Sequence, residues 1–194
     1  MSSAVSPDRM GFTIFIFGGS QGAMGINTLV LEALPLLKPR MNSIKIIHQT
    51  GERDYERVRE GYAKAGVPAR VEKFIYEMPE TYAASSLIIF RAGSSTLSEI
   101  AAVGRASILI PFPEASDNHQ EHNARVFSDA GAAVLLIQGK SKGKDLADAV
   151  FDLLDHSDKR KLMESRVRAF HQAKAADRIA DGLRVDLVSI ARGV

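Results

Sequence analysis

The sequence predicts an α/β fold, a doubly wound parallel sheet followed by C-terminal helices. Short apolar runs alternate with longer amphipathic patterns from residue 12 to about residue 139, as strands and helices do in such a fold. Several runs are apolar at successive positions, which is typical of strands covered on both faces. Two runs end in glycine-rich turns that open a helix, at 18–23 and 91–99, and parallel sheets bind ligands beyond such strand ends.

Six short runs are the strand candidates, several of them apolar at successive positions, and helical patterns fill the gaps between them. In chain order the strands are Phe12–Phe17, Ile44–His48, Ala69–Lys73, Leu87–Phe90, Ser107–Ile110 and Ala133–Ile137. The helices are Ala23–Leu37, Arg53–Ala65, Met78–Ala84, Ser95–Val103 and His119–Asp129. Gly104 and Gly131 follow the ends of two helices, as glycines in left-handed C-caps do. The alternation predicts right-handed crossovers between parallel strands.

After about residue 139 the pattern changes to helices alone. Lys144–Asp155 and Asp158–Lys174 are amphipathic, and Ala175–Ala191 is expected to close the domain. Residues 1–10, where Ser, Pro and Asp collect, are expected to be a linker or tail, and residues 11–194 to form one domain. The second of these helices carries a basic cluster that faces either solvent or an anionic membrane, a solvated face being the simpler interpretation. Its members are Lys159, Arg160, Lys161, Arg166 and Arg168.

Composition excludes several classes of protein. A chain of 194 residues with 45% hydrophobic and 25% charged residues is typical of one folded domain with its own core. It has no cysteine, which excludes disulfides and thiolate chemistry. No apolar stretch approaches the roughly 20 residues of a membrane span, and the first residues lack signal-peptide features, so we expect a cytoplasmic protein. A net charge of +2 gives no reason to expect a nucleic-acid partner.

The first glycine-rich turn favours an anion. Backbone N–H groups at a helix start point to one spot, and the helix dipole adds roughly half a positive charge there. The turn lacks both the Gly-Lys-Ser/Thr ending of a Walker loop and the dinucleotide spacing, which disfavours ATP hydrolysis. A tight turn without a ligand is the alternative. The candidate binding residues are Gly19, Ser20, Gln21 and Gly22.

The second glycine-rich turn adds a carboxylate. Two such turns in one sheet predict a cradle for a diphosphate. We expect Thr96, Ser98 and Glu99 in the first turn of the helix, where the Glu99 carboxylate can accept hydrogen bonds from two vicinal ribose hydroxyls. A capping-box or dipole-stabilising glutamate, with Ser95 or Thr96 near the cap, is the alternative. The candidate residues are Gly93, Ser94, Ser95, Thr96, Leu97, Ser98 and Glu99.

Polar side chains also follow the fifth predicted strand. His119, Gln120 and Asn123 lie within one helical turn, and amide groups suit sugar hydroxyls because they donate and accept at once. His119 is otherwise a helix-start residue. A metal is not expected, because no third ligand is spaced to complete a site with His119 and His122.

Two further loops end strands at the same edge. The first, 48–51, either lines the cleft or forms a turn; a turn is favoured, with Gln49 packing under the glycine cradle. The second, 74–78, contains aromatic and aliphatic residues that can stack on a base and offer backbone groups to its edge. A loop packed over the core is the alternative for this second segment.

Together these segments resemble the C-terminal half of the bacterial MurG glycosyltransferases over nearly the whole chain. The resemblance rests on Gly-Gly-Ser-Gln-Gly-Ala at 18–23, Asn27, His-Gln-Thr-Gly at 48–51, Phe74-Ile75, Met78, Arg-Ala-Gly at 91–93, Thr96, Glu99, Pro-Phe-Pro at 111–113, His119-Gln120, Asn-Ala-Arg at 123–125 and Ala-Gly-Ala-Ala at 130–133. It implies the Rossmann-like donor half of a GT-B enzyme. That family moves N-acetylglucosamine, with inversion, from UDP-GlcNAc to undecaprenyl-linked muramyl pentapeptide, making lipid II for peptidoglycan.

The resemblance also implies roles for residues. Ser20 and its turn would contact the diphosphate or sugar, and the backbone of Ile75 would bind uracil. The stretch 94–99 would hold phosphates and ribose, and Gln120, helped by His119 and Asn123, would bind the N-acetylglucosamine hydroxyls. No cofactor or metal is implied, and the sequence has no Asp-x-Asp motif. The sequence departs from the family's usual pattern at Ser94-Ser95, Ser85-Ser86 and Arg105-Ala106. None of these departures removes a presumed ligand contact, but the extra hydroxyls at 94–95 can alter the affinity for phosphate.

The implied partners lie outside this half of the fold. In the family, an N-terminal domain carries the acceptor site, the membrane-docking patch and a suspected general base, so no catalytic residue is assigned here. The chain would then bind UDP-GlcNAc and meet a lipid-linked acceptor as a peripheral protein at the cytoplasmic face of the inner membrane. Three alternatives stay open: the catalytic half of a two-chain transferase, a non-catalytic UDP-sugar-binding module and, weakest, an NAD-type oxidoreductase.

Overall fold

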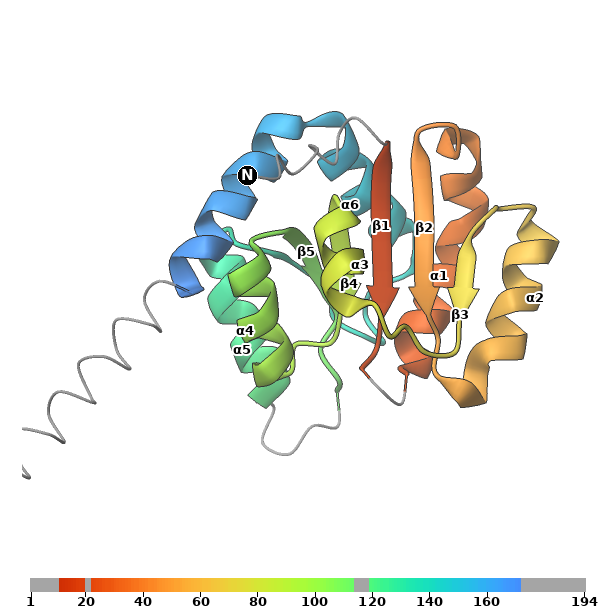
Figure 1. Ribbon diagram of the computed structural model, residues 1–194, viewed down its shortest axis with the longest axis horizontal. Helices are drawn as coiled ribbons and strands as arrows, with labels where there is room; N and C mark the ends of the chain where they lie inside the picture. The colour runs from red at the N-terminus through yellow and green to blue at the C-terminus, as the bar shows by residue number, and fades with distance from the viewer. Residues whose placement is uncertain (1–10, 20–21, 114–118, 172–194) are drawn as a thin grey trace, which may run out of the picture.

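The strands form one parallel sheet, as the alternating pattern predicts. The computed structural model describes residues 11–19, 22–113 and 119–171. In this part of the chain six strands pair in the order β3-β2-β1-β4-β5-β6 (Figure 1). They are β1 (Phe12–Phe17), β2 (Ile44–Gln49), β3 (Arg70–Glu72), β4 (Leu87–Phe90), β5 (Ala106–Leu109) and β6 (Val134–Leu135). The doubly wound fold class is therefore confirmed.

Helices cover both faces of the sheet. The described helices are α1 (Met24–Leu37), α2 (Tyr55–Ala65), α3 (Met78–Ala84), α4 (Ser94–Val103), α5 (His119–Asp129) and α6 (Gly143–Asp155), with short 3₁₀ turns η2 (Lys38–Arg40) and η3 (Glu52–Asp54). Residues 157–171 are helical too. The predicted tail at 1–10 and the last predicted helix at 175–191 lie outside the described residues.

Alternate residues of β1 divide the core into two layers. Ile14 and Ile16 pack with the apolar faces of α1, α2 and α6 on one side of the sheet. Phe15 and Phe17 pack with α3, α4 and α5 on the other. All six β1 residues are buried, which explains why all of them except Thr13 are apolar instead of every second one.

Several predicted boundaries need correction. The edge strand β6 is shorter than 133–137, because the chain turns after it: Gly139 has φ +83° and the N–H of Ser141 donates to Ile137 O at 2.9 Å. Strand β5 begins one residue earlier than predicted, since Ala106 pairs with Leu87. Helix α2 begins at Tyr55 rather than Arg53, because η3 precedes it.

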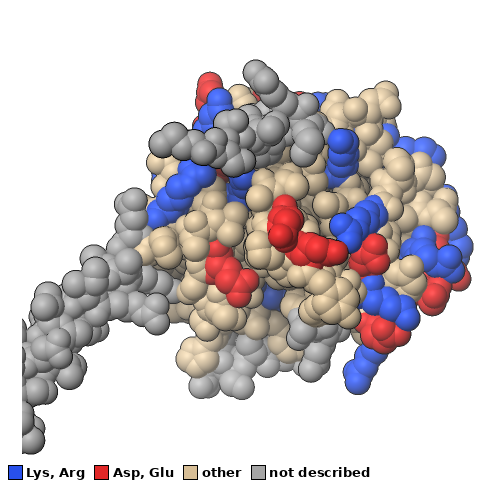
Figure 2. Space-filling view, viewed as in Figure 1, with Lys and Arg blue, Asp and Glu red and all other residues tan. Residues whose placement is uncertain are grey.

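The predicted basic cluster does not form one free face. Arg160 is buried, donates to the Leu153 carbonyl at 2.9 Å and lies over the Phe12 ring. Arg166 and Arg168 lie against Gly131 and Gly104, the left-handed glycines that follow α5 and α4, where cations favour the negative ends of the helix dipoles. Both interpretations of the cluster are thus wrong for Arg160. On the face shown in Figure 2, acidic and basic side chains are interspersed.

Candidate functional site

The two glycine-rich turns meet at the point where the strand order reverses. β1 and β4 are neighbours, with Ile16 opposite Ile89, although α1 to α3 separate them in the chain. The crossover after β1 and the crossover after β4 run to opposite sides of the sheet, which opens a crevice beyond the strand ends. At those ends the rings of Phe17 and Phe90 stack, with centroids 5.6 Å apart. Sequence reasoning had placed both turns at this edge, which is confirmed.

The first turn has no room for side chains at two of its glycines. Gly22 has φ +77°, its N–H donates to the Gly19 carbonyl at 3.1 Å, and an added Cβ would lie 2.8 Å from the carbonyl carbon of Thr50. A Cβ at Gly18 would lie 2.7 Å from the Gly22 carbonyl carbon. Gly19 has φ +88° but nothing within 4 Å of an added Cβ, so it faces open space. Ser20 and Gln21 lie outside the described residues.

The second turn leads into α4 one residue earlier than predicted. Gly93 is the N-cap and Ser94 the first helical residue, with no side-chain cap. Ser94 and Ser95 are exposed, Ser98 Oγ donates to the Ser94 carbonyl at 3.0 Å, and Leu97 is a buried core residue. The exposed start of α4 is available to an anion.

The placement of Ser98 and Glu99 in the first helical turn is wrong, because α4 starts at Ser94 and has no acidic residue in its first turn. Thr96 does lie in that turn. The capping-box alternative for Glu99 fails for the same reason, since the carboxylate is too far along the helix to reach the cap. Glu99 instead accepts a hydrogen bond from Tyr82 Oη at 3.1 Å.

A cavity of about 200 Å³ brings the predicted nucleoside residues together. It is lined by Phe17 and Gly19 at the end of β1, Gln49 at the end of β2, Phe74 after β3, Met78 and Tyr82 of α3, and Thr96 and Glu99 of α4. The cavity therefore combines an aromatic wall, a carboxylate and a glycine turn, which are the groups that a base, a ribose and a phosphate need.

Gln49 joins two walls of this cavity, as predicted for a residue packed under the glycine cradle. Its Nε2 donates to the Gly19 carbonyl at 3.1 Å, and its Oε1 accepts from the N–H of Ile75 at 2.8 Å. The side chain is buried; its bond with Ile75 is buried too, and its bond with Gly19 is partly buried. The Ile75 N–H is thereby engaged, which leaves the carbonyl as the backbone group for a base; the uracil role of Ile75 stays a prediction.

The loop after β3 has both buried and exposed side chains. Ile75 is fully buried in the core, whereas Phe74 and Tyr76 are exposed and contact each other with ring centroids 4.9 Å apart. Ile75 therefore fits the interpretation of a loop packed over the core, and base stacking by the exposed residues stays a prediction. Phe74 lines the 200 Å³ cavity.

A second cavity, of about 360 Å³, lies on the α1 side of the glycine turn. Its lining includes Gly18, Gly22, Phe112 and Gln120. Gln120 Oε1 accepts a hydrogen bond from the N–H of Phe112 at 3.0 Å, which fixes the amide at the cavity wall. Among the described lining residues, Gln120 is the only one of the three predicted sugar-binding side chains; His119 and Asn123 share its helical turn but do not line the cavity.

Sequence reasoning missed Arg91, which also lines the 360 Å³ cavity. Its Nη1 donates to the carbonyls of Ile110 (3.0 Å) and Pro111 (2.9 Å), and the guanidinium lies over the Phe112 ring. Burial lowers the pKa of Arg91 to about 10, and the group remains charged at neutral pH. The sequence places this cation between a buried strand and a glycine turn, but nothing in it indicates the contacts with Ile110, Pro111 and Phe112.

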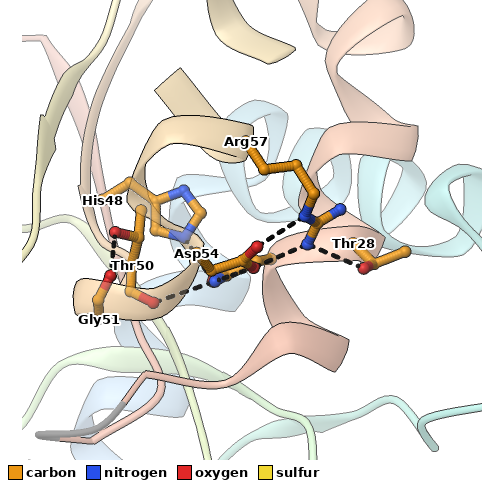
Figure 3. A network of polar contacts seen from close by, with 7 residues as sticks. Thr28, His48, Thr50, Gly51, Asp54 and Arg57 are labelled. Atoms are coloured by element: carbon orange, nitrogen blue, oxygen red, sulfur yellow. Dashed lines mark hydrogen bonds and ion pairs between the residues drawn. The ribbon is translucent and has the colours of Figure 1, made fainter. Parts of the chain in front are cut away.

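A buried polar network holds the turn after β2 in place (Figure 3). Asn27 Nδ2 donates to the Thr50 carbonyl (3.1 Å) and to Asp54 Oδ2 (2.7 Å). The Asn27 oxygen must then accept from His48 Nε2 (3.0 Å), and His48 Nδ1 accepts from Tyr62 Oη (3.1 Å). These bonds define a neutral Nε2–H histidine, and burial lowers its pKa to about 3.

The network ends in an ion pair at the surface. Arg57 donates to both carboxylate oxygens of Asp54, at 2.6 and 2.7 Å, and to Thr28 Oγ1 at 3.2 Å. The Arg57 guanidinium holds the pKa of Asp54 below its usual range. Since Gly22 packs on Thr50, this network supports the glycine turn from behind. The position of Gln49 beneath the cradle is confirmed, but 48–51 is not simply a turn: His48 and Gln49 end β2, and Gln49 also lines the cavity.

Within residues 11–19, 22–113 and 119–171, no three His, Cys, Asp or Glu side chains are grouped closely enough to hold a metal ion. None of the helices in these ranges has the length and hydropathy needed to span a bilayer.

Comparison with known proteins points to one group. Residues 13–179 match the family model of the glycosyltransferase family 28 C-terminal domain. A Myxococcus xanthus UDP-N-acetylglucosamine–N-acetylmuramyl-(pentapeptide) pyrophosphoryl-undecaprenol N-acetylglucosamine transferase is 44% identical over 188 residues, 97% of this chain and 48% of the relative. A Geobacter enzyme of the same name is 43% identical over 87% of this chain and 45% of its own length. The chain spans about half the length of these curated relatives.

A solved structure agrees with the sequence matches. The crystal structure of Acinetobacter baumannii MurG superposes with a TM-score of 0.74 at 31% identity, covering 86% of this chain and 49% of that one. The shared region is again about half of the larger protein.

Proposed function

The chain belongs to the family of glycosyltransferase family 28 C-terminal domains, and from this premise we propose that it binds UDP-N-acetylglucosamine as the donor half of an inverting transferase. The acceptor is a lipid-linked muramyl pentapeptide, as the names of the curated relatives suggest. The observation that carries the proposal is the 200 Å³ cavity at the switch point, where Gly19, Phe74, Thr96 and Glu99 converge.

Each of the two cavities binds a different part of the donor. Phe74 and Met78 provide an apolar wall for uracil, and Glu99 accepts the two ribose hydroxyls. The diphosphate lies between the glycine turn and the start of α4, because both offer backbone N–H groups to an anion. The hexose then enters the 360 Å³ cavity, where Gln120 and Arg91 lie.

The chemistry is a displacement at C1 of the sugar. An acceptor hydroxyl attacks C1, the bond from C1 to the diphosphate oxygen breaks, and its electron pair leaves with UDP. Negative charge then grows on the β-phosphate, where the N-termini of α1 and α4 stabilise it electrostatically. Arg91 adds a fixed positive charge in the 360 Å³ cavity. The acceptor proton passes to a base outside this chain's described residues.

Transfer requires an acceptor domain. The curated relatives are about twice as long as the matched region, which supports a second domain in the same polypeptide or a separate subunit that completes the cleft. This chain by itself therefore binds the donor and transfers the sugar poorly. The same partner places the reaction at the cytoplasmic face of the membrane, where a lipid-linked acceptor is found.

Calorimetric titration tests the proposal. The chain should bind UDP-GlcNAc and UDP, and bind NAD with no measurable affinity. Glu99→Ala should weaken UDP binding by about 1–3 kcal/mol, the scale of losing charged hydrogen bonds. Glu60→Ala is the matched control, because Glu60 is an exposed helical glutamate on α2, outside the lining of both cavities.

Two results would contradict the proposal. An unchanged UDP affinity in Glu99→Ala would show that the Glu99 carboxylate does not bind the nucleotide. Efficient sugar transfer by the chain without any added partner would remove the need for an acceptor domain.

A further inference from the structure

Tyr82 connects the aromatic core to the Glu99 carboxylate in the 200 Å³ cavity. Its hydroxyl, on α3, donates to Glu99 Oε2, on α4, at 3.1 Å. Both side chains line the 200 Å³ cavity. The two residues are 17 positions apart in the chain, so the tertiary fold and not a local turn brings them together.

The Tyr82 ring is fixed by its neighbours. The residue is 5% exposed, and the ring makes edge contacts with Phe15 (centroids 5.7 Å apart) and Phe17 (5.9 Å). Both phenylalanines belong to β1, the central strand of the sheet. An aromatic side chain packed against two rings of the same strand has little freedom to move its hydroxyl.

Glu99 has no comparable support of its own. It is exposed on the surface of α4, and a free glutamate loses considerable rotamer entropy when it becomes ordered. Among the described residues, the Tyr82 hydroxyl is its only hydrogen-bond or ion-pair partner. A hydroxyl donating to a carboxylate is a strong, charge-assisted bond.

The bond leaves the carboxylate competent to bind a ligand. Each carboxylate oxygen can accept two hydrogen bonds, so Oε2 retains one site beside Tyr82 and Oε1 retains both. Burial and the nearby Glu99 raise the pKa of the Tyr82 hydroxyl, which therefore stays a donor at neutral pH. Two vicinal hydroxyls can then donate to a carboxylate that is already oriented.

We propose that Tyr82 is a positioning residue that orients Glu99 toward the vicinal diol of a nucleotide and so contributes to discrimination of ribose from 2′-deoxyribose. The proposal rests on the proposed function, since it assumes that the cavity takes a uridine nucleotide. Tyr82 itself touches neither the reacting atoms nor the sugar that is transferred.

Titration of UDP and 2′-deoxy-UDP into Tyr82→Phe tests this role. The substitution removes the hydroxyl and keeps the ring on β1. We expect UDP affinity to fall about three- to tenfold, on the scale of one hydrogen bond, and 2′-deoxy-UDP affinity to change less. The ratio of the two dissociation constants should therefore move toward one. Tyr55→Phe, on α2 and outside the lining of both cavities, should leave the ratio unchanged.

A second measurement uses Glu99→Ala as the background. There Tyr82→Phe should have no further effect on UDP binding, because the carboxylate that it orients is absent. A loss of equal size for both nucleotides, or the same loss in the Glu99→Ala background, would overturn the positioning role. If the wild-type chain fails to bind UDP, both proposals fail; if it binds UDP and prefers ribose but Tyr82→Phe keeps that preference, only this one fails.

Discussion

The tight contact between Gly22 and Thr50 makes Gly22→Ala a direct test of how the glycine turn is built. Gly22 and Gly19 share positive φ angles, +77° and +88°. They differ in their surroundings: a Cβ at Gly22 would lie 2.8 Å from the Thr50 carbonyl carbon and 2.9 Å from Gly51 Cα, whereas a Cβ at Gly19 would meet nothing within 4 Å. Gly19→Ala is therefore the matched control, because it changes backbone preference without a collision.

The two substitutions should differ by several kilocalories per mole. Each places alanine in the left-handed region, which costs about 1–2 kcal/mol. Gly22→Ala must also push the Thr50 carbonyl away by about 1 Å, because the carbonyl oxygen would lie closer to the new Cβ than the carbon does, which adds about 1–3 kcal/mol of overpacking. Thr50 is buried and its carbonyl accepts from Asn27, so the shift weakens that bond by about 1 kcal/mol more. The totals are about 3–6 kcal/mol for Gly22→Ala and about 1–2 kcal/mol for Gly19→Ala.

Thermal unfolding followed by circular dichroism, without ligand, measures the difference. A gap of at least about 2 kcal/mol corresponds to a melting temperature lower by about 4–8 °C for Gly22→Ala in a chain of this size. Urea unfolding provides the free energies independently. Equal destabilisation by the two substitutions would refute the reasoning, because it would show that Gly22 is selected by its φ angle alone.

The remaining predictions concern three other positions. His48 is held neutral in the folded state with a pKa of about 3, while an unfolded histidine titrates near 6.5; the unfolded state therefore binds more protons as the pH falls, and stability in urea should drop by about 2 kcal/mol between pH 7 and pH 5. Gln49→Glu cannot donate to the Gly19 carbonyl, so UDP affinity measured by calorimetry should fall about tenfold, and an unchanged affinity would exclude Gln49 as a support of the cradle. Gly104→Ala should lower the melting temperature more than Gly104→Asn, because the position has φ +66° and asparagine tolerates left-handed backbone better; the reverse order would mean that contact with Arg168 decides the outcome.

Local signals explain which parts of the fold the sequence could predict. The bounds of β1, β4, α3 and α5 agree with the predicted ranges. The two strands are almost entirely apolar and are followed by glycine or a polar residue, and Pro79 lies in the first turn of α3. The error at β6 has a different origin. Its apolar run continues past the last sheet pair, and only the tertiary turn around Gly139 ends the strand.

The residues of the candidate site also fall into a predictable and an unpredictable group. The glycine turns and Glu99 were predictable, because their residue types and their position after a strand carry the information. Arg91 and Tyr82 were not, since each acts through a partner from another element: Arg91 through carbonyls after β5, and Tyr82 through a carboxylate on α4. Nothing in the spacing of these residues along the chain indicates those contacts.

The position of β1 in the middle of the sheet affects when the nucleotide site can form. The strand beside it, β4, is more than seventy residues away: Thr13 and Ser86, which bond to each other, are 73 positions apart. A nascent chain that has paired only β1, β2 and β3 therefore has one half of the anion cradle and none of the carboxylate. Nucleotide binding should thus report completed folding, and a nucleotide at a hundred times its dissociation constant should stabilise the finished domain by about 2.7 kcal/mol while leaving such partly folded chains unaffected.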